Sequence, residues 1–178
     1  MSDTSPSPAP SNSTPTSRHL GQWGEAIVGH WLTQQGCHLL AQGWRCRWGE
    51  LDWIAQYPLD QTHTPPLAPE PTLIFVEVKT RSRYNWDANG LLAISPQKQA
   101  KLWRTAQYYL AQHPQKAELP CRFDVALVTY QAPARSTSPY LPTAITLPTS
   151  VQIALNQPLT LGNFCFTLDT YLPNVLAA

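Results

Sequence analysis

The sequence predicts an α/β protein in which helices flank a mixed central sheet. Three observations support this fold class. Apolar residues recur at helical spacing near the N-terminus, three short β-favouring segments follow, and a second helical stretch precedes another apolar strand. The resulting αβββαβ order favours a mixed sheet with a helix on each face. A chain of 178 residues also has the usual size of one domain.

The first helix is expected to begin near Arg18 and to end before Gly36. Between these residues the apolar side chains follow a helical period, and Gly36 stands where a left-handed cap ends a helix. Three further glycines, Gly21, Gly24 and Gly29, each weaken a helix by up to about 1 kcal/mol relative to alanine. Either close packing against a sheet or a nearby ligand would explain them.

Two segments after this helix predict a β-hairpin. They are CHLLAQGWRCRW and GELDWIAQY, both rich in apolar and aromatic residues, with Trp48-Gly49 as the turn. A Pro-rich loop over residues 58–71 then leads into LIFVEVKT, which is typical of a buried strand.

Ser95 and Pro96 predict the start of a second helix, as the N-cap and the first helical residue. CRFDVALVTY follows it and is apolar enough to be a central strand. Closer to the C-terminus, VQIALN and FCFTLDTYL are expected to add edge strands.

Composition divides the chain into three parts. Residues 1–17 are rich in Ser, Pro and Thr and predict a disordered tail, which lacks the basic start and apolar stretch of a signal peptide. Residues 18–130 are expected to form the main domain. Residues 131–178 are expected to combine a Pro-rich linker with a C-terminal extension packed on the same domain.

The distribution of charge is more informative than its total. A net charge of +1 and a pI near 7.7 exclude a globally basic, histone-like binder, so any nucleic-acid surface must be local. Eight of the 12 basic residues fall between Arg45 and Arg104. A solvated charged face is the alternative interpretation. The residues expected to contact nucleic acid are Arg81, Arg83, Lys98 and Lys101.

The cysteines and the hydropathy indicate the compartment. Cys37, Cys46, Cys121 and Cys165 lack the paired spacing of a zinc site or a disulfide framework, so they are expected to be buried thiols in a reducing compartment. No apolar run approaches the length of a membrane span. A cytoplasmic protein without a membrane partner is therefore expected.

Four carboxylates stand out as candidates for chemistry. Glu50 and Asp52 lie two apart on one predicted strand, as do Glu77 and Lys79 on the next, so each pair shares a face. Glu25 lies on the side of the first helix that faces the sheet. Because clustered anions need a cation, these residues favour a site for Mg²⁺, with Mn²⁺ as a substitute. Taken alone, Glu77 and Lys79 would more simply form an ion pair at a strand end.

Five ordered motifs resemble the YraN family of bacteria. They are G-x-x-G-E (21–25), G-E-L-D (49–52), F-V-E-V-K (75–79), a helix opening near Lys98 and R-F-D-V (122–125). The resemblance covers residues 20–128. That family is placed in the PD-(D/E)xK nuclease superfamily, near the archaeal Holliday-junction resolvases, and implies a restriction-endonuclease-like core.

The resemblance also implies roles for particular residues. Asp52 and Glu77 would bind the metal ion, with the Val78 carbonyl as an additional ligand. Lys79 would be the catalytic lysine and Glu25 an accessory acid. Glu50 belongs to a family motif, but the resemblance assigns it no role. The expected activity is metal-dependent cleavage of branched or otherwise structured DNA.

The sequence leaves two other functions open. One is a nucleic-acid-binding protein of the same fold without useful turnover, and the other is an interaction protein that uses the Pro-rich segments. Trp48 and Trp86 are the tryptophans expected to contact nucleic acid, whereas the others are expected in the core. Asp124 is interpreted as a structural partner of Arg122. The oligomeric state stays open, a homodimer included.

Overall fold

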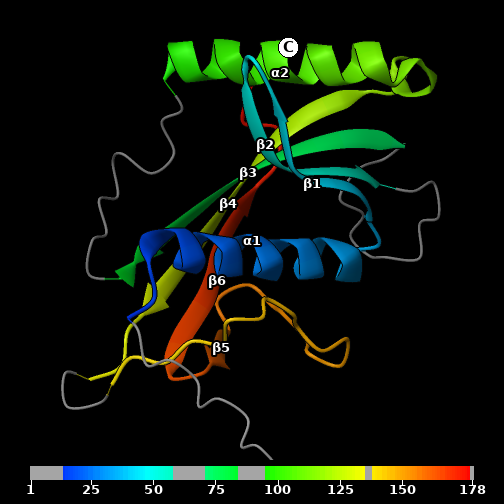
Figure 1. Ribbon diagram of the computed structural model, residues 1–178. Helices are drawn as coiled ribbons and strands as arrows, with labels where there is room; N and C mark the ends of the chain where they lie inside the picture. Colours follow the sequence, from blue (N-terminus) through cyan, green and yellow to red (C-terminus); the bar gives the residue numbers. More distant parts are fainter. Residues whose placement is uncertain (1–13, 58–70, 84–94, 135–137, 177–178) are drawn as a thin grey trace, which may run out of the picture.

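The computed structural model describes residues 14–57, 71–83, 95–134 and 138–176 (Figure 1). Most of the predicted tail, nearly all of the Pro-rich loop and Trp86 lie outside these residues. The elements in chain order are α1 (Ser17–Gln34), β1 (His38–Cys46), β2 (Gly49–Tyr57), β3 (Thr72–Ser82), α2 (Pro96–Gln112), a short 3-10 helix (Pro114–Lys116), β4 (Cys121–Gln131), β5 (Pro158–Leu161) and β6 (Phe164–Leu172).

The strands form one six-stranded sheet in the spatial order β1-β2-β3-β4-β6-β5. Among the described strands, β3 and β4 are the parallel pair, and α2 lies between them in the chain; the other neighbours are antiparallel. The predicted αβββαβ order and the mixed sheet are therefore confirmed through β4.

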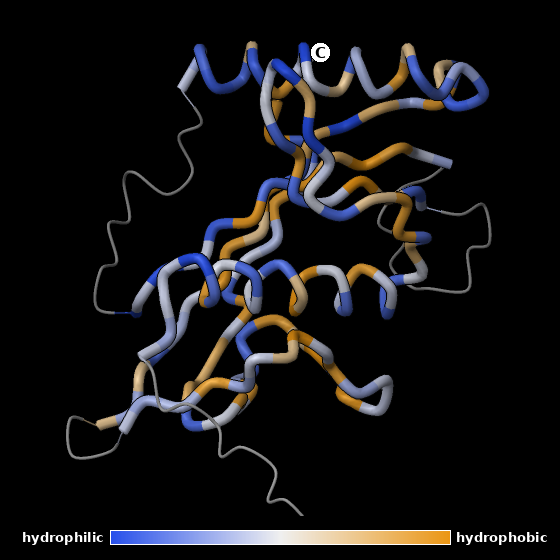
Figure 2. The backbone as a smooth tube through the Cα atoms, in the orientation of Figure 1, coloured by the Kyte–Doolittle hydropathy of each residue, from blue (hydrophilic) through white to orange (hydrophobic). Residues whose placement is uncertain are grey.

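Two hydrophobic clusters cover opposite faces of the sheet. Ile74 and Val76 of β3 pack with residues of α1, whereas Leu73 and Phe75 pack with residues of α2. This alternation follows from the two-residue period of a strand. Figure 2 shows hydrophobic residues concentrated along the strands between the two helices.

Local signals explain the helix boundaries. The Thr16 side chain accepts a hydrogen bond from the His19 N–H (3.2 Å), and Gly36 adopts a φ of 83° just after α1. The Ser95 hydroxyl likewise accepts from the Lys98 N–H (3.3 Å), with Pro96 at the first helical position. Both predicted helices are confirmed, with α1 beginning one residue earlier than expected.

Two of the three glycines in α1 are explained by packing. A Cβ on Gly24 would lie 1.9 Å from Oγ1 of Thr80, and one on Gly29 would lie 2.3 Å from the ring of Trp53. Both glycines therefore let α1 lie directly on β2 and β3. A Cβ on Gly21 would meet no heavy atom within 4 Å.

Three expectations about strands need correction. The hairpin turn is formed by Arg47 and Trp48, one residue before the expected position. FCFTLDTYL does form β6, but as an internal strand between β4 and β5. VQIALN is not a strand, because its backbone bonds to α1 instead: the Gln34 amide accepts from the Ile153 N–H (3.0 Å) and donates to the Val151 carbonyl (2.6 Å).

The cysteines are all free thiols, as expected, but Cys37 alone is fully buried and the other three are half-buried. Burial raises the pKa of Cys37 to about 12. No helix in the described residues is long and apolar enough to cross a membrane.

Asp124 occupies the centre of a buried polar network, which supports its structural interpretation. Its Oδ2 accepts hydrogen bonds from the Arg122 guanidinium (3.0 Å) and the Tyr171 hydroxyl (2.6 Å). Its Oδ1 accepts from the Asn174 backbone N–H (2.9 Å). Asp124 therefore joins β4 to β6 and to the segment that follows it.

Candidate metal and nucleic-acid site

The site lies where β2 and β3 stop pairing. Backbone pairing between these strands runs from Tyr57–Thr72 to Trp53–Val76. The next residues along each strand are Asp52 and Glu77. Here Oδ2 of Asp52 accepts a 2.7 Å hydrogen bond from the Val78 N–H, so a carboxylate of β2 bonds to the backbone of β3 beside Glu77.

Glu77 forms ion pairs with two lysine side chains. Nζ of Lys79 lies 2.8 Å from Oε1 of Glu77, and Nζ of Lys98, from α2, contacts the same oxygen. The Glu77 side chain is 14% exposed, against 24% for Lys79 and 40% for Lys98. The simple interpretation of Glu77 and Lys79 as an ion pair is thus confirmed.

The pKa values of the two carboxyl groups move in opposite directions. Burial raises the pKa of Asp52 to about 7, and repulsion from Glu77 adds to this effect. Burial would also raise the pKa of Glu77, but the hydrogen bonds from Lys79 and Lys98 lower it below its ordinary value. Burial lowers the pKa of Lys79, and the neighbouring Lys98 acts in the same direction.

An open cavity of about 450 Å³ lies beside Asp52. Burial raises the pKa of Glu25 there, while the Gln42 side chain opposes the rise. The missing side chain of Gly21 leaves room in this cavity. The residues that line it are Arg18, Gly21, Gln22, Glu25, Gln42, Gly43, Arg45, Glu50 and Asp52.

Glu50 has a clear partner in the structure. It stands directly opposite Arg45 in the hairpin, and its Oε1 lies 2.7 Å from the Arg45 guanidinium. Both side chains are solvent-exposed, at 39% and 65%. Glu50 therefore stabilises the orientation of Arg45 at the cavity, a contact that the sequence could have suggested from the hairpin register.

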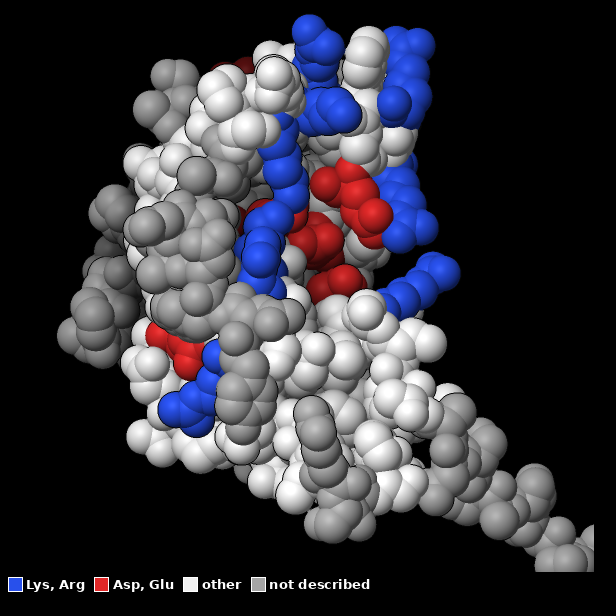
Figure 3. Space-filling view, turned by 90° about the vertical axis from the view of Figure 1, so that its left-hand side faces the viewer, with Lys and Arg blue, Asp and Glu red and all other residues white. Residues whose placement is uncertain are grey.

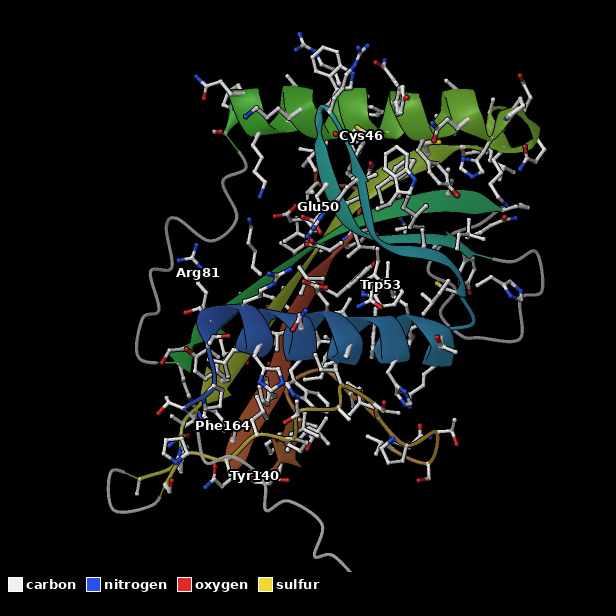
Figure 4. All side chains as sticks on the ribbon, viewed as in Figure 1. Cys46, Glu50, Trp53, Arg81, Tyr140 and Phe164 are labelled. Atoms are coloured by element: carbon white, nitrogen blue, oxygen red, sulfur yellow. The ribbon has the colours of Figure 1, made fainter. Side chains whose placement is uncertain are left out.

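Basic side chains surround the acidic ones. Figure 3 shows the carboxylates gathered in a hollow with Lys and Arg side chains on both sides. Of the residues expected to contact nucleic acid, Lys98 reaches Glu77, whereas Lys101 is exposed on α2 and Arg81 and Arg83 are exposed at the end of β3. Figure 4 shows Arg81 near the start of α1, apart from Glu50.

The structure therefore brings together most of the predicted site. Asp52, Glu77, Val78 and Lys79 meet where the strands part, and Glu25 shares the adjacent cavity with Asp52. Arg18, Arg45 and Gln42 also line the cavity and were not predicted as site residues. No local pattern marks Arg18 or Gln42, because their position depends on how α1 packs against the hairpin.

The donor set fits a hard divalent cation. In the described part of the chain, no three His, Cys, Asp or Glu side chains converge into a metal-binding group. Two carboxylates and a backbone carbonyl are nevertheless enough for magnesium, which is normally bound by one or two carboxylates together with substrate phosphate and water. The residues for such a site are Asp52, Glu77 and Val78.

Comparison with known proteins gives one family model, described as uncharacterised protein family UPF0102, which matches residues 24–128. A UPF0102 protein of Acaryochloris marina (strain MBIC 11017) is 47% identical over 172 residues, covering 94% of this chain and 96% of the relative. One of Thermosynechococcus vestitus is 52% identical over 130 residues, covering 73% of this chain and 96% of the relative. A third, of Synechocystis sp. (strain ATCC 27184 / PCC 6803 / Kazusa), is 40% identical over 153 residues, or 86% of this chain and 94% of the relative.

Proposed function

This chain belongs to the uncharacterised protein family UPF0102, the YraN family, as its motifs predicted, and we propose that it is a divalent-metal-dependent nuclease. Its fold would be restriction-endonuclease-like, and its substrate would be structured or branched DNA. One observation carries the proposal: Asp52, Glu77 and Lys79, with the Val78 backbone, meet at the point where β2 and β3 part.

Asp52, Glu77 and the Val78 carbonyl would hold Mg²⁺, or Mn²⁺ in its place. When bound, such an ion supplies a Lewis acid that stabilises negative charge on a phosphodiester undergoing hydrolysis. Repulsion from Glu77 opposes the ionisation of Asp52, so a cation bound between the two carboxylates would be favoured.

Lys79 would orient the attacking water and stabilise charge on the phosphate. Its Nζ lies beside the carboxylates, and its pKa is lowered chiefly by burial, which is common for lysines in active sites. Lys98 contacts the same Glu77 oxygen from α2, so it would help to position Glu77. Glu25 would act from the cavity as an accessory acid.

Basic side chains around the acidic hollow would position the DNA backbone. Arg81, Arg83 and Lys101 are exposed, and contacts of this kind to phosphate fix the register of DNA without reading its sequence. No recognition helix or zinc module is predicted, so structure would be recognised in preference to sequence. A reducing, cytoplasmic location would suit the free thiols.

The test is a cleavage assay on single-stranded, duplex and four-way-junction DNA. Each substrate is incubated with EDTA, magnesium or manganese and separated on a denaturing gel. Metal-dependent products from the parent, absent with Asp52→Asn and Lys79→Ala, support the proposal. Lys116→Ala serves as the control, since Lys116 contacts Gln56 past the end of α2. Equal cleavage by all four proteins would point to a contaminant and reject the site.

A second candidate is a binding protein of the same fold that does not cleave. The observation that favours it is the pairing of Glu77 with both Lys79 and Lys98, because two ammonium groups already neutralise the carboxylate that a metal needs. The same substrates decide between the two functions. DNA binding without products under any metal condition would favour this candidate.

A further inference from the structure

The turn of the β1–β2 hairpin exposes a tryptophan. Trp48 is 39% exposed, whereas Trp23, Trp31 and Trp53 are buried in the core. Burying a tryptophan stabilises a fold strongly, so a large exposed ring at a turn contributes little of that stabilisation. This position points to a role outside the core.

Two guanidinium groups lie against the exposed ring. Arg47, the other turn residue, places its Cζ 4.9 Å from the centre of the Trp48 ring, and Arg104 of α2 places its Cζ 5.4 Å from it. Both distances suit a cation–π interaction. Lys101, one turn earlier on α2, is also exposed. The ring is therefore surrounded by positive charge, which suits neither a lipid tail nor an apolar protein surface.

The hairpin holds this ring in a defined place. Trp44 packs edge-on against Tyr109 of α2 at 5.3 Å, and Gly49 comes so close to Thr105 that a Cβ would lie 3.1 Å from its hydroxyl. The Trp48 N–H also donates to Sγ of Cys46 at 3.4 Å. Figure 4 shows Cys46 beside α2 and above Glu50. The turn is thus packed against α2, on the side of the molecule where the acidic hollow lies.

We infer that Trp48, with Arg47 and Arg104, is a platform that binds an unpaired base of the nucleic acid while the guanidiniums contact the adjoining phosphates. Base–aromatic stacking needs an accessible ring, and the phosphates need cations next to it. The ring is 39% exposed, and an incoming base would displace a guanidinium from the ring face toward the adjoining phosphate. The inference rests on the proposed function in one respect, since its ligand is nucleic acid.

The platform would make the protein prefer DNA with unpaired arms. Asp52 lies four positions after Trp48 in the chain, which corresponds to roughly 13 Å of extended backbone. At about 3.4 Å per nucleotide in a stacked strand, the bound base would lie on the order of four nucleotides from the carboxylates. The substrate class that fits this platform is therefore DNA in which a duplex meets a single strand.

The experiment measures binding in EDTA, so that it does not depend on cleavage. The probes are a fluorescent blunt duplex and the same duplex with unpaired arms, each titrated by anisotropy. The variants are Trp48→Ala, Trp48→Phe and Trp48→Leu, with Tyr140→Ala as the control. Tyr140 is also an exposed aromatic residue, at 44%, and lies at the opposite end of the molecule (Figure 4).

The parent should bind the forked probe more tightly than the blunt one. Trp48→Ala and Trp48→Leu should weaken binding of the forked probe by about 5- to 150-fold, the range that one stacked base corresponds to, and leave the blunt probe unchanged. Trp48→Phe should keep most of the preference, and Tyr140→Ala all of it. Because Leu retains apolar bulk, it tests stacking even where Ala destabilises the hairpin.

Two results overturn this inference and leave the proposed function standing. One is a parent that binds both probes equally. The other is a set of Trp48 variants that keep the preference or weaken both probes alike, as a docking surface for another protein or a purely electrostatic contact would. A parent that binds neither probe overturns the inference, and it overturns the proposed function as well if the metal-dependent cleavage assay also yields no products.

Discussion

The Val78 backbone N–H donates a 2.7 Å hydrogen bond to Oδ2 of Asp52, which links the carboxylate of β2 to β3. A neighbouring strand would normally accept that N–H, but backbone pairing between β2 and β3 ends at Trp53–Val76. The carboxylate of Asp52 therefore lies next to that of Glu77, and the two groups differ in their partners. Glu77 has two lysines, whereas Asp52 is placed by a neutral amide.

This difference predicts that Asp52→Asn stabilises the metal-free protein at high pH. The pKa of Asp52 rises from 3.8 to about 7 on folding, so the folded state binds its proton more tightly. Stability is then lost as the pH rises from about 4 to about 7 and stays lower above it. Asn is always neutral. The variant should exceed the parent by up to about 4 kcal/mol at pH 8 and little at pH 4, as urea unfolding in EDTA would measure.

Bound metal should reverse the order of stability of the parent and the Asp52→Asn variant. Excess magnesium or manganese should raise the melting temperature of the parent and not that of Asp52→Asn, since a ligand stabilises only the state that binds it. A parent that is unaffected by metal, together with a variant that is less stable at pH 8 in EDTA, would show that Asp52 has a structural role alone.

Glu77→Gln should have the opposite effect in EDTA. The variant leaves the ammonium groups of Lys79 and Lys98 beside each other without a carboxylate, which should reduce the free energy of unfolding by roughly 1–3 kcal/mol for partly exposed pairs. Because the pKa of Glu77 is lowered on folding, this contribution is present at neutral pH and is lost as the pH falls through the folded value.

A second substitution tests whether repulsion between Lys79 and Lys98 causes the lower stability of Glu77→Gln. Adding Lys98→Met to Glu77→Gln removes one of the two facing ammonium groups and should recover part of the lost stability. If the double variant instead loses more free energy of unfolding than the two single variants lose together, repulsion between the lysines is not the cause.

Alanine substitutions at two glycines of α1, Gly24 and Gly21, test how closely this helix packs against β3. Gly24→Ala would place a Cβ 1.9 Å from Oγ1 of Thr80, so the helix and β3 would have to separate, at about 1–3 kcal/mol. Gly21→Ala meets open space and should stabilise the helix by up to about 1 kcal/mol. Chemical denaturation of both variants measures the difference. Equal effects at the two positions would mean that α1 does not lie as close to β3 as described.

Substitutions at Asp124 and Glu50 compare how much a buried and an exposed ion pair contribute to stability. Asp124→Asn removes the charge that holds Arg122 in the interior and should reduce stability by about 3–5 kcal/mol. Glu50→Gln breaks an exposed pair with Arg45 and should cost less than about 1 kcal/mol. Thermal unfolding at neutral pH compares them, and a small loss for Asp124→Asn would contradict its structural role.

The parts of the fold that were predictable depend on local signals. The Ser95-Pro96 start of α2 and Gly36 after α1 are caps that act within a few residues. Asp52 and Glu77 also followed from sequence, because two-residue spacing fixes the face of a strand and the hairpin order makes β2 a neighbour of β3.

The parts that were not predictable depend on contacts between distant segments. The position of β6 between β4 and β5 requires a pairing partner about 40 residues away along the chain, which propensity does not report. The contact of Lys98 with Glu77 depends on how α2 packs over β3. For the same reason, Arg104 could not be placed beside Trp48 from sequence alone.

Basic residues lie on either side of the acidic hollow (Figure 3). Lys101 lies one turn beyond Lys98 on α2, and Arg81 lies at the far end of β3; both are exposed. If DNA crosses the hollow between them, each makes a phosphate contact and releases about one counterion. Lys101→Gln and Arg81→Gln should then each reduce the slope of log affinity against log salt by about 1. Lys116→Gln should leave it unchanged, because Lys116 contacts Gln56 past the other end of α2. Anisotropy at several salt concentrations in EDTA measures the slopes. A reduced slope for Lys101→Gln and not for Arg81→Gln would place the DNA along α2 alone, and no change for either would place it on another face.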